Sequence, residues 1–466
     1  MILRWSKANG YKDVLAISLP LIASMGSITL MEFTDRVFLA NYSLDAISAA
    51  LPAGISSFLF ISFFMGVGNY TNAFVAQYIG AGAPERVGAA LWQGIYFSLI
   101  ASLILASLYF IAGPMFSLIG HPQEIQRLEV TYFRIVICGA GLVVLSSVLS
   151  CFYSGRGLTR IVMFIHLAGA LVNIPLDYCV INGIGPFPEL GIAGAAFATV
   201  TAFAVITLLF CLAVFSRKNR QRFGTWRERS LDPELFRRLM RYGLPSGIQM
   251  FLEVFSFTFF ILMLGRLGDR AMATSNIVLS IESLSFLPMI GMHIGISTLA
   301  GQAVGKKRPE DGVYATNSAL HLVFIYMVFI AIAFIVFPGP FLALFKPDEI
   351  PDQEYAKIVD SGIILLRFVA VYCFFDALNL VYSGTLKGAG DTRFIMKAIG
   401  ILALTVMILP IYLVVEILPL GLYTSWAILT LYISALGITF MLRYKHGAWK
   451  KMQVIEDTAE MEKSGF

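Results

Sequence analysis

The chain has 466 residues, of which 58% are hydrophobic and only 14% are charged, and its formal net charge is +5. A soluble domain is about 45–50% apolar and about 25% charged. The composition therefore excludes a nucleic-acid module, a disordered regulator and a secreted disulfide scaffold. The five cysteines lie in apolar segments and form neither a CxxC pair nor a spacing typical of zinc sites. A polytopic membrane protein is predicted, with the lipid bilayer as its surroundings.

Twelve apolar stretches are each long enough to cross the hydrocarbon core, which takes about 20 residues in a helix. In chain order they cover residues 13–38, 50–80, 87–113, 131–154, 161–183, 191–216, 236–264, 272–304, 313–337, 360–386, 394–417 and 421–442. The predicted fold class is an all-α membrane protein with twelve transmembrane helices.

Lys and Arg residues concentrate in alternate loops, and by the positive-inside rule these loops and both termini face the cytoplasm. The densest run, Arg217 to Arg241, joins the sixth and seventh helices. Such a run could bind lipid headgroups or nucleic acid, but a topology determinant between two halves is the favoured interpretation. The first helix is expected to direct insertion, because no cleavable signal pattern precedes it. We expect a multi-pass protein of the cell membrane, the inner membrane if the source is bacterial.

The second half of the chain repeats patterns of the first half at one constant offset. Three patterns recur in this way: Pro20 as Pro245, Gln77-x-x-Gly80-x-x-x-Pro84-Glu85 as Gln302-x-x-Gly305-x-x-x-Pro309-Glu310, and Pro122-x-Glu124-Ile125 as Pro347-x-Glu349-Ile350. Repeats of this kind predict two pseudo-symmetric lobes of six helices in the same orientation, with the substrate between them. We divide the chain into an N-lobe (1–216), a basic cytoplasmic linker (217–241) and a C-lobe with a cytoplasmic tail (242–466).

Carboxylates inside membrane helices are costly, about 2.5–3.5 kcal/mol on insertion scales, and so indicate function. Asp35 follows Glu32 and precedes Arg36 in the first helix, and Glu32 and Arg36 have the spacing of an ion pair. Asp35 is therefore the freer acid, in the outer half of its helix. The alternative is that Asp35 pairs with Arg36 at the surface.

The fifth helix places Asn173 and Asp177 four positions apart on one stripe, with Pro175 between them. The proline frees a backbone carbonyl, and Thr201 in the sixth helix offers a hydroxyl. These oxygen ligands suit a small hard cation such as Na⁺. Interhelical hydrogen bonding is the structural alternative.

The second half offers Glu253 in the seventh helix and Asp376 in the tenth, which could bind a proton or cation between them. A neutral structural acid is the alternative. Accessory polar groups are Gln249, Tyr372, Asn379 and, in the eighth helix, Glu282.

Several long motifs resemble the multidrug and toxic compound extrusion (MATE) family. They are MEFTDRVFLANYSLDAISAA, VAQYIGAGAPERVGAAL, GRGLTRIVMFIHLAGALVNIPLDYCVINGIGPFPELGIAGAAFATV and YSGTLKGAGDT. The resemblance covers nearly the whole chain. It implies two six-helix lobes and an antiporter that is driven by Na⁺ or H⁺ and exports organic, often cationic, compounds.

The resemblance also assigns residues. Asp35, Asn173, Asp177 and Thr201 match the N-lobe ion site of the family, while Glu253 and Asp376 match the C-lobe acids of its NorM-type branch. The NIPLDY motif is closer to the DinF-type branch, so the features are mixed. We expect no cofactor beyond the coupling ion, no nucleic-acid partner, and a monomer.

Two other functions fit parts of the sequence. A flippase for a lipid-linked cell-envelope precursor, of the same superfamily, would need a cationic groove, for which Arg134 and Arg367 are the deep basic candidates. An intramembrane aspartyl protease is suggested by GAGD at Gly388–Asp391, but Asp376 and Asp391 are close in the chain and straddle one helix end. The sequence contains no HExxH, P-loop or GxSxG motif, and we expect a transporter and not an enzyme.

Overall fold

The computed structural model describes residues 2–346, 351–418 and 420–456, and 87% of it is helical. Within these ranges, twelve helical segments are long and apolar enough to cross a membrane, which confirms the predicted fold class. The repeat motif at 347–350 lies outside the described residues.

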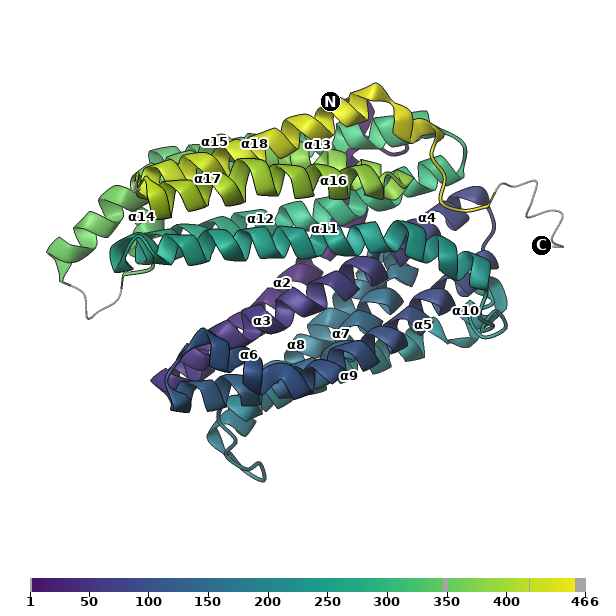
Figure 1. Ribbon diagram of the computed structural model, residues 1–466. Coiled ribbons are helices and arrows are strands. Elements are labelled where there is room, and N and C mark those ends of the chain that lie inside the picture. Colours follow the sequence, from purple (N-terminus) through teal and green to yellow (C-terminus); the bar gives the residue numbers. More distant parts are fainter. Residues whose placement is uncertain (1, 347–350, 419, 457–466) are drawn as a thin grey trace. The chain divides into compact units, whose positions relative to one another are not determined.

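Figure 1 shows the helices, coloured by their position in the sequence. The spans of the first half are α2 (Tyr11–Tyr42), α3 and α4 (Leu44–Asn69 and Thr71–Ala81), α5 with η1 and α6 (Arg86–Ser107, Leu108–Ile111 and Ala112–Ile119), α7 (Gln123–Ser154), α8 (Thr159–Asn182) and α9 (Ile192–Val214). Those of the second half are α11 (Pro233–Gly265), α12 (Asp269–Gly305), α13 (Pro309–Val336), α15 (Asp352–Ala389), the segment α16–η2–α17–η3 (Thr392–Leu402, Ala403–Ile408, Leu409–Tyr412 and Leu413–Ile417) and α18 (Leu422–His446). Short helices lie outside the spans: α1 (Ile2–Trp5), α10 (Arg217–Phe223), α14 (Pro338–Ala343) and η4 (Ala448–Lys451).

The chain folds as two compact units. The N-terminal unit contains residues 23–251, 301–307 and the tail from 453, and the C-terminal unit contains residues 1–22, 252–300 and 308–452. Three of the five boundaries between the units fall inside the long helices α2, α11 and α12.

One helix forms the centre of each unit. In the N-terminal unit α7 packs along α3, α5 and α9, and in the C-terminal unit α15 packs along α13 and α18. Small residues allow this close packing in a membrane, where no hydrophobic driving force holds helices together. A Cβ on Gly139 of α7 would lie 2.4 Å from the Val200 side chain, and one on Gly437 of α18 would lie 2.3 Å from the Phe375 carbonyl oxygen.

The internal repeat is visible as matching helix contacts. In the N-terminal unit, a Cβ on Gly66 would lie 2.8 Å from the Cα of Gly247. The corresponding positions of the repeat make the equivalent contact in the C-terminal unit, where a Cβ on Gly291 would lie 2.5 Å from the Ile22 side chain. Equivalent glycines thus allow α3 to approach α11 and α12 to approach α2.

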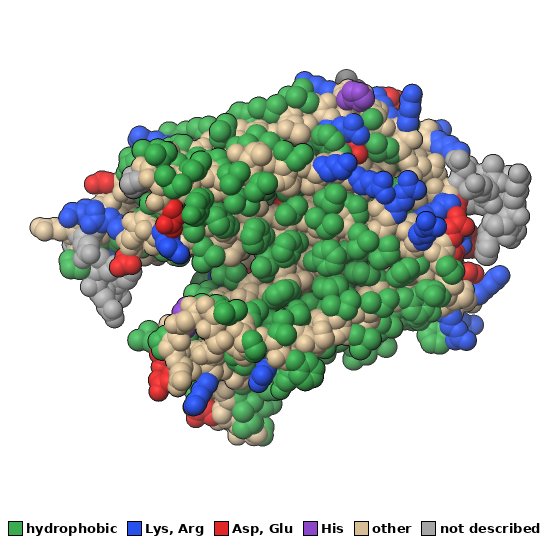
Figure 2. Space-filling view, viewed as in Figure 1, with side chains coloured by type: hydrophobic (Ala, Val, Ile, Leu, Met, Phe, Trp, Pro, Cys, Tyr) green, Lys and Arg blue, Asp and Glu red, His purple; other side chains and the backbone are tan. Residues whose placement is uncertain are grey.

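The exposed surface is that of a membrane protein. Figure 2 shows hydrophobic side chains along the lengths of the helices. Large apolar side chains such as Leu103, Phe110 and Phe329 are exposed. Since water would make such exposure unfavourable, these flanks face lipid.

Candidate functional site

The N-terminal unit buries two carboxylates and an amide on two helices. Asp35 of α2 is 8% exposed, and Asn173 and Asp177 of α8 are 1% and 0% exposed. The carboxyl groups of Asp35 and Asp177 lie close enough for their charges to act on each other. The structure therefore brings together three of the four residues predicted for the N-lobe site.

Local packing explains this geometry. Met31, Ala170 and Ala202 form a small buried cluster that joins α2, α8 and α9. Asp35 lies one helical turn beyond Met31, so the cluster directs its side chain toward α8. Thr201 precedes Ala202 by one position and is exposed, because consecutive helix positions point about 100° apart. Its part in the site stays a prediction.

Pro175 lies inside the continuous helix α8 and is exposed. Asn173 and Asp177, two positions to either side of it, are buried. The proline therefore interrupts the backbone hydrogen bonds of α8 beside the buried stripe without occupying it.

Five buried polar atoms of this cluster have no hydrogen-bond partner among the described residues: Oδ1 of Asp35, both carboxylate oxygens of Asp177, and Oδ1 and Nδ2 of Asn173. A buried polar atom without a partner costs about 1–3 kcal/mol. A cluster of this kind is stabilised by a proton shared between the carboxylates or by a small cation bound to the oxygens.

Tyr132 of α7 is a member of this site that the sequence did not single out. It is buried, and its hydroxyl is close enough to Asp35 and Asp177 for their charges to act on it. Little in the sequence marks this position, because Tyr132 lies in the half of α7 that also carries Glu124, Arg127, Glu129 and Arg134.

The C-terminal unit holds a second polar cluster around Asp376 of α15. Asn379 donates a hydrogen bond from Nδ2 to Oδ1 of Asp376 at 3.1 Å. Glu282 of α12 lies near the Tyr372 hydroxyl and close enough to Asp376 for mutual repulsion, as does Glu253 of α11. Asp376 thus has an acid near it on each of two other helices, and one of these is Glu282, which was predicted as an accessory residue.

Glu253 differs from its neighbours in being exposed, whereas Asp376 is buried. Tyr432 of α18, also buried, lies near Glu253 and was not predicted. Gln249, one turn before Glu253 in α11, is buried and belongs to the N-terminal unit. In neither unit do the described residues include three or more His, Cys, Asp or Glu side chains placed to hold a metal ion.

Asp391, the acid of the GAGD motif, has a structural partner. Arg443 of α18 donates from Nε to Oδ2 of Asp391 at 2.7 Å and from its guanidinium to Oδ1 at 3.3 Å. Asp391 is thus bound to a cation at the start of α16, which is the role of an anchor and not of a catalytic acid.

The MatE family model matches residues 20–179 and 245–413. The two matches begin at positions 20 and 245, which are the paired prolines of the internal repeat. The probable multidrug resistance protein NorM of Thermotoga maritima is 25% identical over 454 residues, which are 95% of this chain and 94% of the relative. The multidrug resistance protein PmpM of Pseudomonas aeruginosa is 27% identical and covers 83% of this chain and 80% of its own length.

Solved structures share the fold. The structure of a MOP superfamily transporter from Pyrococcus furiosus superposes with a TM-score of 0.86 at 22% identity and covers 97% of this chain and 98% of its own. That of a multidrug resistance MATE family transporter in an outward-facing conformation has the same TM-score and identity and covers 96% and 98%. At this identity the comparison shows the arrangement of the helices.

Proposed function

The chain belongs to the MatE family, whose members are membrane transporters and not enzymes, and from this premise we propose that it exports small organic cations in exchange for Na⁺ or H⁺. The names of its relatives, which are multidrug resistance proteins, support drug efflux. The orientation we propose places both termini in the cytoplasm, and the functional form we propose is the monomer.

One observation carries the coupling: two buried carboxylates close enough for their charges to act on each other, beside an amide whose polar atoms have no partner among the described residues. Two negative charges so close in a poorly solvated place repel strongly, and binding of one positive charge relieves the repulsion. Asp35 and Asp177 therefore form a receptor for a single monovalent cation or proton.

The export cycle uses competition for that charge. Without a bound ion, the pair of Asp35 and Asp177 is anionic and attracts a cationic compound. Once a Na⁺ or H⁺ arrives from outside, the pair is neutralised and the compound loses its electrostatic partner. Pro175 offers a place where α8 can bend as occupancy changes.

The membrane potential adds drive. One elementary charge that moves inward down 100 mV gains about 2.3 kcal/mol, which is roughly a fiftyfold concentration ratio at equilibrium. A second ion at the cluster of Glu253, Glu282 and Asp376 would increase this ratio, and its three acids make it the second candidate coupling site.

The flippase alternative depends on Arg134, which lines a pocket with Tyr109 and Phe197, and on Arg367. Arg134 donates to the Tyr109 carbonyl and stacks on the Tyr109 ring, and Arg367 is exposed. Neither lies with the buried acids, so the charge inside each unit favours a cationic cargo.

The test is transport by the purified protein in liposomes, with a fluorescent organic cation as cargo. A Na⁺ gradient is imposed at equal pH, and a pH gradient is imposed at equal Na⁺. We expect one of the two to drive accumulation against the cargo gradient. If neither gradient drives transport while cargo still equilibrates, the protein is a facilitator and the coupling proposal is wrong.

A further inference from the structure

The residues that follow the last membrane helix are bound to the N-terminal unit. After η4, the segment Gln453–Glu456 buries two apolar side chains, Val454 at 2% and Ile455 at 5% exposure. The backbone N–H of Val454 donates to Oε1 of Gln77 at 2.9 Å.

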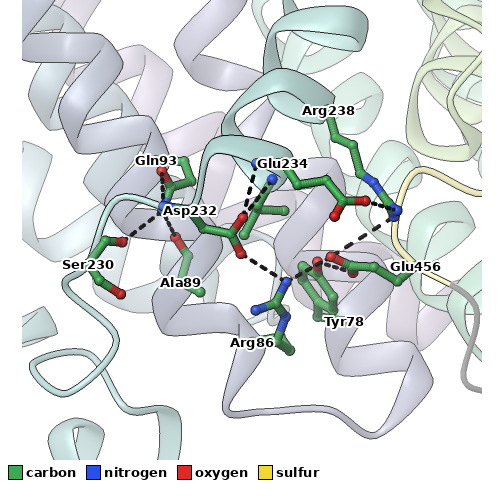
Figure 3. A network of polar contacts seen from close by, with 10 residues as sticks. Tyr78, Arg86, Ala89, Gln93, Ser230, Asp232, Glu234, Arg238 and Glu456 are labelled. Carbon is green, nitrogen blue, oxygen red and sulfur yellow. Dashed lines mark hydrogen bonds and ion pairs between the residues drawn. The ribbon is translucent and has the colours of Figure 1, made fainter. Parts of the chain in front are cut away.

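Glu456 makes the most specific contact of this segment (Figure 3). Its carboxylate accepts a hydrogen bond from the Tyr78 hydroxyl at 2.5 Å and one from Arg86 at 2.7 Å. Arg238 lies 3.9 Å from the same carboxylate. The side chains of Arg86 and Glu456 are only 16% and 13% exposed, so solvent screens this ion pair weakly.

The donors come from three helices. Tyr78 lies in α4, Arg86 begins α5, and Arg238 lies in the first turns of α11. Arg86 also binds Asp232, and Arg238 binds Glu234, so each cation is already held in place by another acid. The carboxylate of Glu456 therefore enters a preformed site.

The segment docks beside the point at which the two sequence repeats cross. A Cβ on Gly80 would lie 2.2 Å from the Gln302 carbonyl oxygen, and one on Gly305 would lie 2.1 Å from the Gln77 carbonyl oxygen. The side chains of the two glutamines differ, however: Gln77 holds the tail, while Gln302 donates to the Gly155 carbonyl. The tail thus makes the two repeats unequal.

We propose that Gln453–Glu456 is a latch, which docks on α4, α5 and α11 in one conformation of the transporter and releases in another. Gln453 follows directly on Met452, the last residue of the C-terminal unit. When the latch is docked, the chain therefore connects the two units at one more place. Transporters with parallel repeats work largely by rigid movement of one bundle against the other. A contact made in only one of two states shifts the population toward that state.

The latch is expected to be insensitive to pH near neutrality. Burial alone would raise the pKa of Glu456, but the Tyr78 hydroxyl and the Arg86 guanidinium outweigh it and hold the pKa below its ordinary value. The stabilisation that ionised Glu456 gives to the docked segment is therefore complete above the ordinary pKa of a glutamate. It is lost only as the pH falls through the lowered pKa of the docked Glu456. Any pH response of transport near neutrality arises elsewhere.

The latch proposal rests on the proposed transport function, but its test needs no cargo. Hydrogen exchange of the Val454 and Ile455 amides is measured in lipid nanodiscs for the wild type, Glu456→Gln, Tyr78→Phe and the double variant. The matched control is Glu310→Gln, which removes an exposed ion pair with Lys450 at 3.0 Å inside the C-terminal unit. We expect about tenfold faster exchange in Glu456→Gln, no further acceleration in the double variant, and wild-type exchange in the control.

Spin labels on the two units then report the conformational distribution in the same samples. Glu456→Gln should change the ratio of the two conformations by a factor similar to the change in its exchange rate, while the melting temperature stays that of the wild type. If exchange accelerates and the distribution does not move, or if the tail amides stay equally protected in every conformation, the segment is a permanent anchor and the latch is refuted. A protein with a working latch and no ion-driven transport would instead refute only the proposed function.

Discussion

Replacement of Asp35 by Asn should weaken binding of a cationic compound and remove its dependence on the coupling ion. The asparagine amide is neutral and can donate an N–H to Asp177, as a proton shared by the two acids would. The variant therefore mimics the ion-loaded state permanently. Since Asp35 is 8% exposed and Asp177 is fully buried, the substituted amide has little access to water.

The magnitude follows from the buried geometry. Two unit charges about 4 Å apart attract by about 4 kcal/mol at an effective dielectric constant of about 20. Desolvation of the cargo cancels part of this attraction, and hydrogen bonds to charged groups contribute about 1.5–3 kcal/mol net. The dissociation constant should thus rise roughly 10- to 150-fold.

The assay is equilibrium binding of a fluorescent organic cation to purified protein, titrated with Na⁺ at fixed pH and with pH at fixed Na⁺. The wild type should release the dye in one titration, whereas Asp35→Asn should bind weakly and respond to neither. Asp45→Asn is the matched control, because Asp45 is exposed at the start of α3. An Asp35→Asn protein that releases dye as the wild type does would refute this site and move the competition to the Asp376 cluster.

Three further outcomes are expected. Glu253→Gln and Asp376→Asn should each lower the number of ions exchanged per cargo molecule without unfolding the protein, and wild-type stoichiometry in both would exclude this cluster from coupling. A reactive cysteine introduced between Arg217 and Arg241 should be labelled only from the cytoplasmic side, so labelling from outside would reverse the proposed orientation. Gly80→Leu should lower the free energy of unfolding by about 1–3 kcal/mol or more, because the new side chain would meet the backbone of Gln302. Gly26→Ala should not lower it, because there is open space around that position. Equal melting temperatures for the two variants would contradict the packing argument.

The helices were predictable because membrane spans are long apolar runs, and the repeat was predictable because it keeps a fixed spacing. The hydropathy pattern predicted the wrong ends for helices whose ends carry charge. The fourth span was predicted to begin at residue 131, but α7 begins at Gln123, and its first turns contain Glu124 and Arg127. Such turns lie outside the hydrocarbon core, where charge is tolerated and the hydrophobic signal stops.

The polar clusters were only partly predictable. The four-position spacing between Asn173 and Asp177 fixes a shared helical face, and the structure shows that this face is buried. Contacts between distant helices leave no such period, so the meeting of Glu282 with Asp376 and the burial of Tyr132 appeared only with the tertiary packing. The docking of Glu456 on Arg86 joins two residues that are far apart in the chain, and no local pattern indicates it.

The central claim, that ion and cargo compete for the carboxylate pair, is tested most directly by counting the ions that cargo displaces. If a coupling ion weakens cargo binding by some factor, cargo must weaken ion binding by the same factor. Titration of an organic cation into purified protein, in buffers of different ionisation enthalpy and with radioactive Na⁺ present, measures both ions at once. We predict release of about one H⁺ or one Na⁺ per cargo bound by the wild type and none by the protein with Asp35→Asn and Asp177→Asn; cargo binding that releases neither ion from the wild type would contradict the claim.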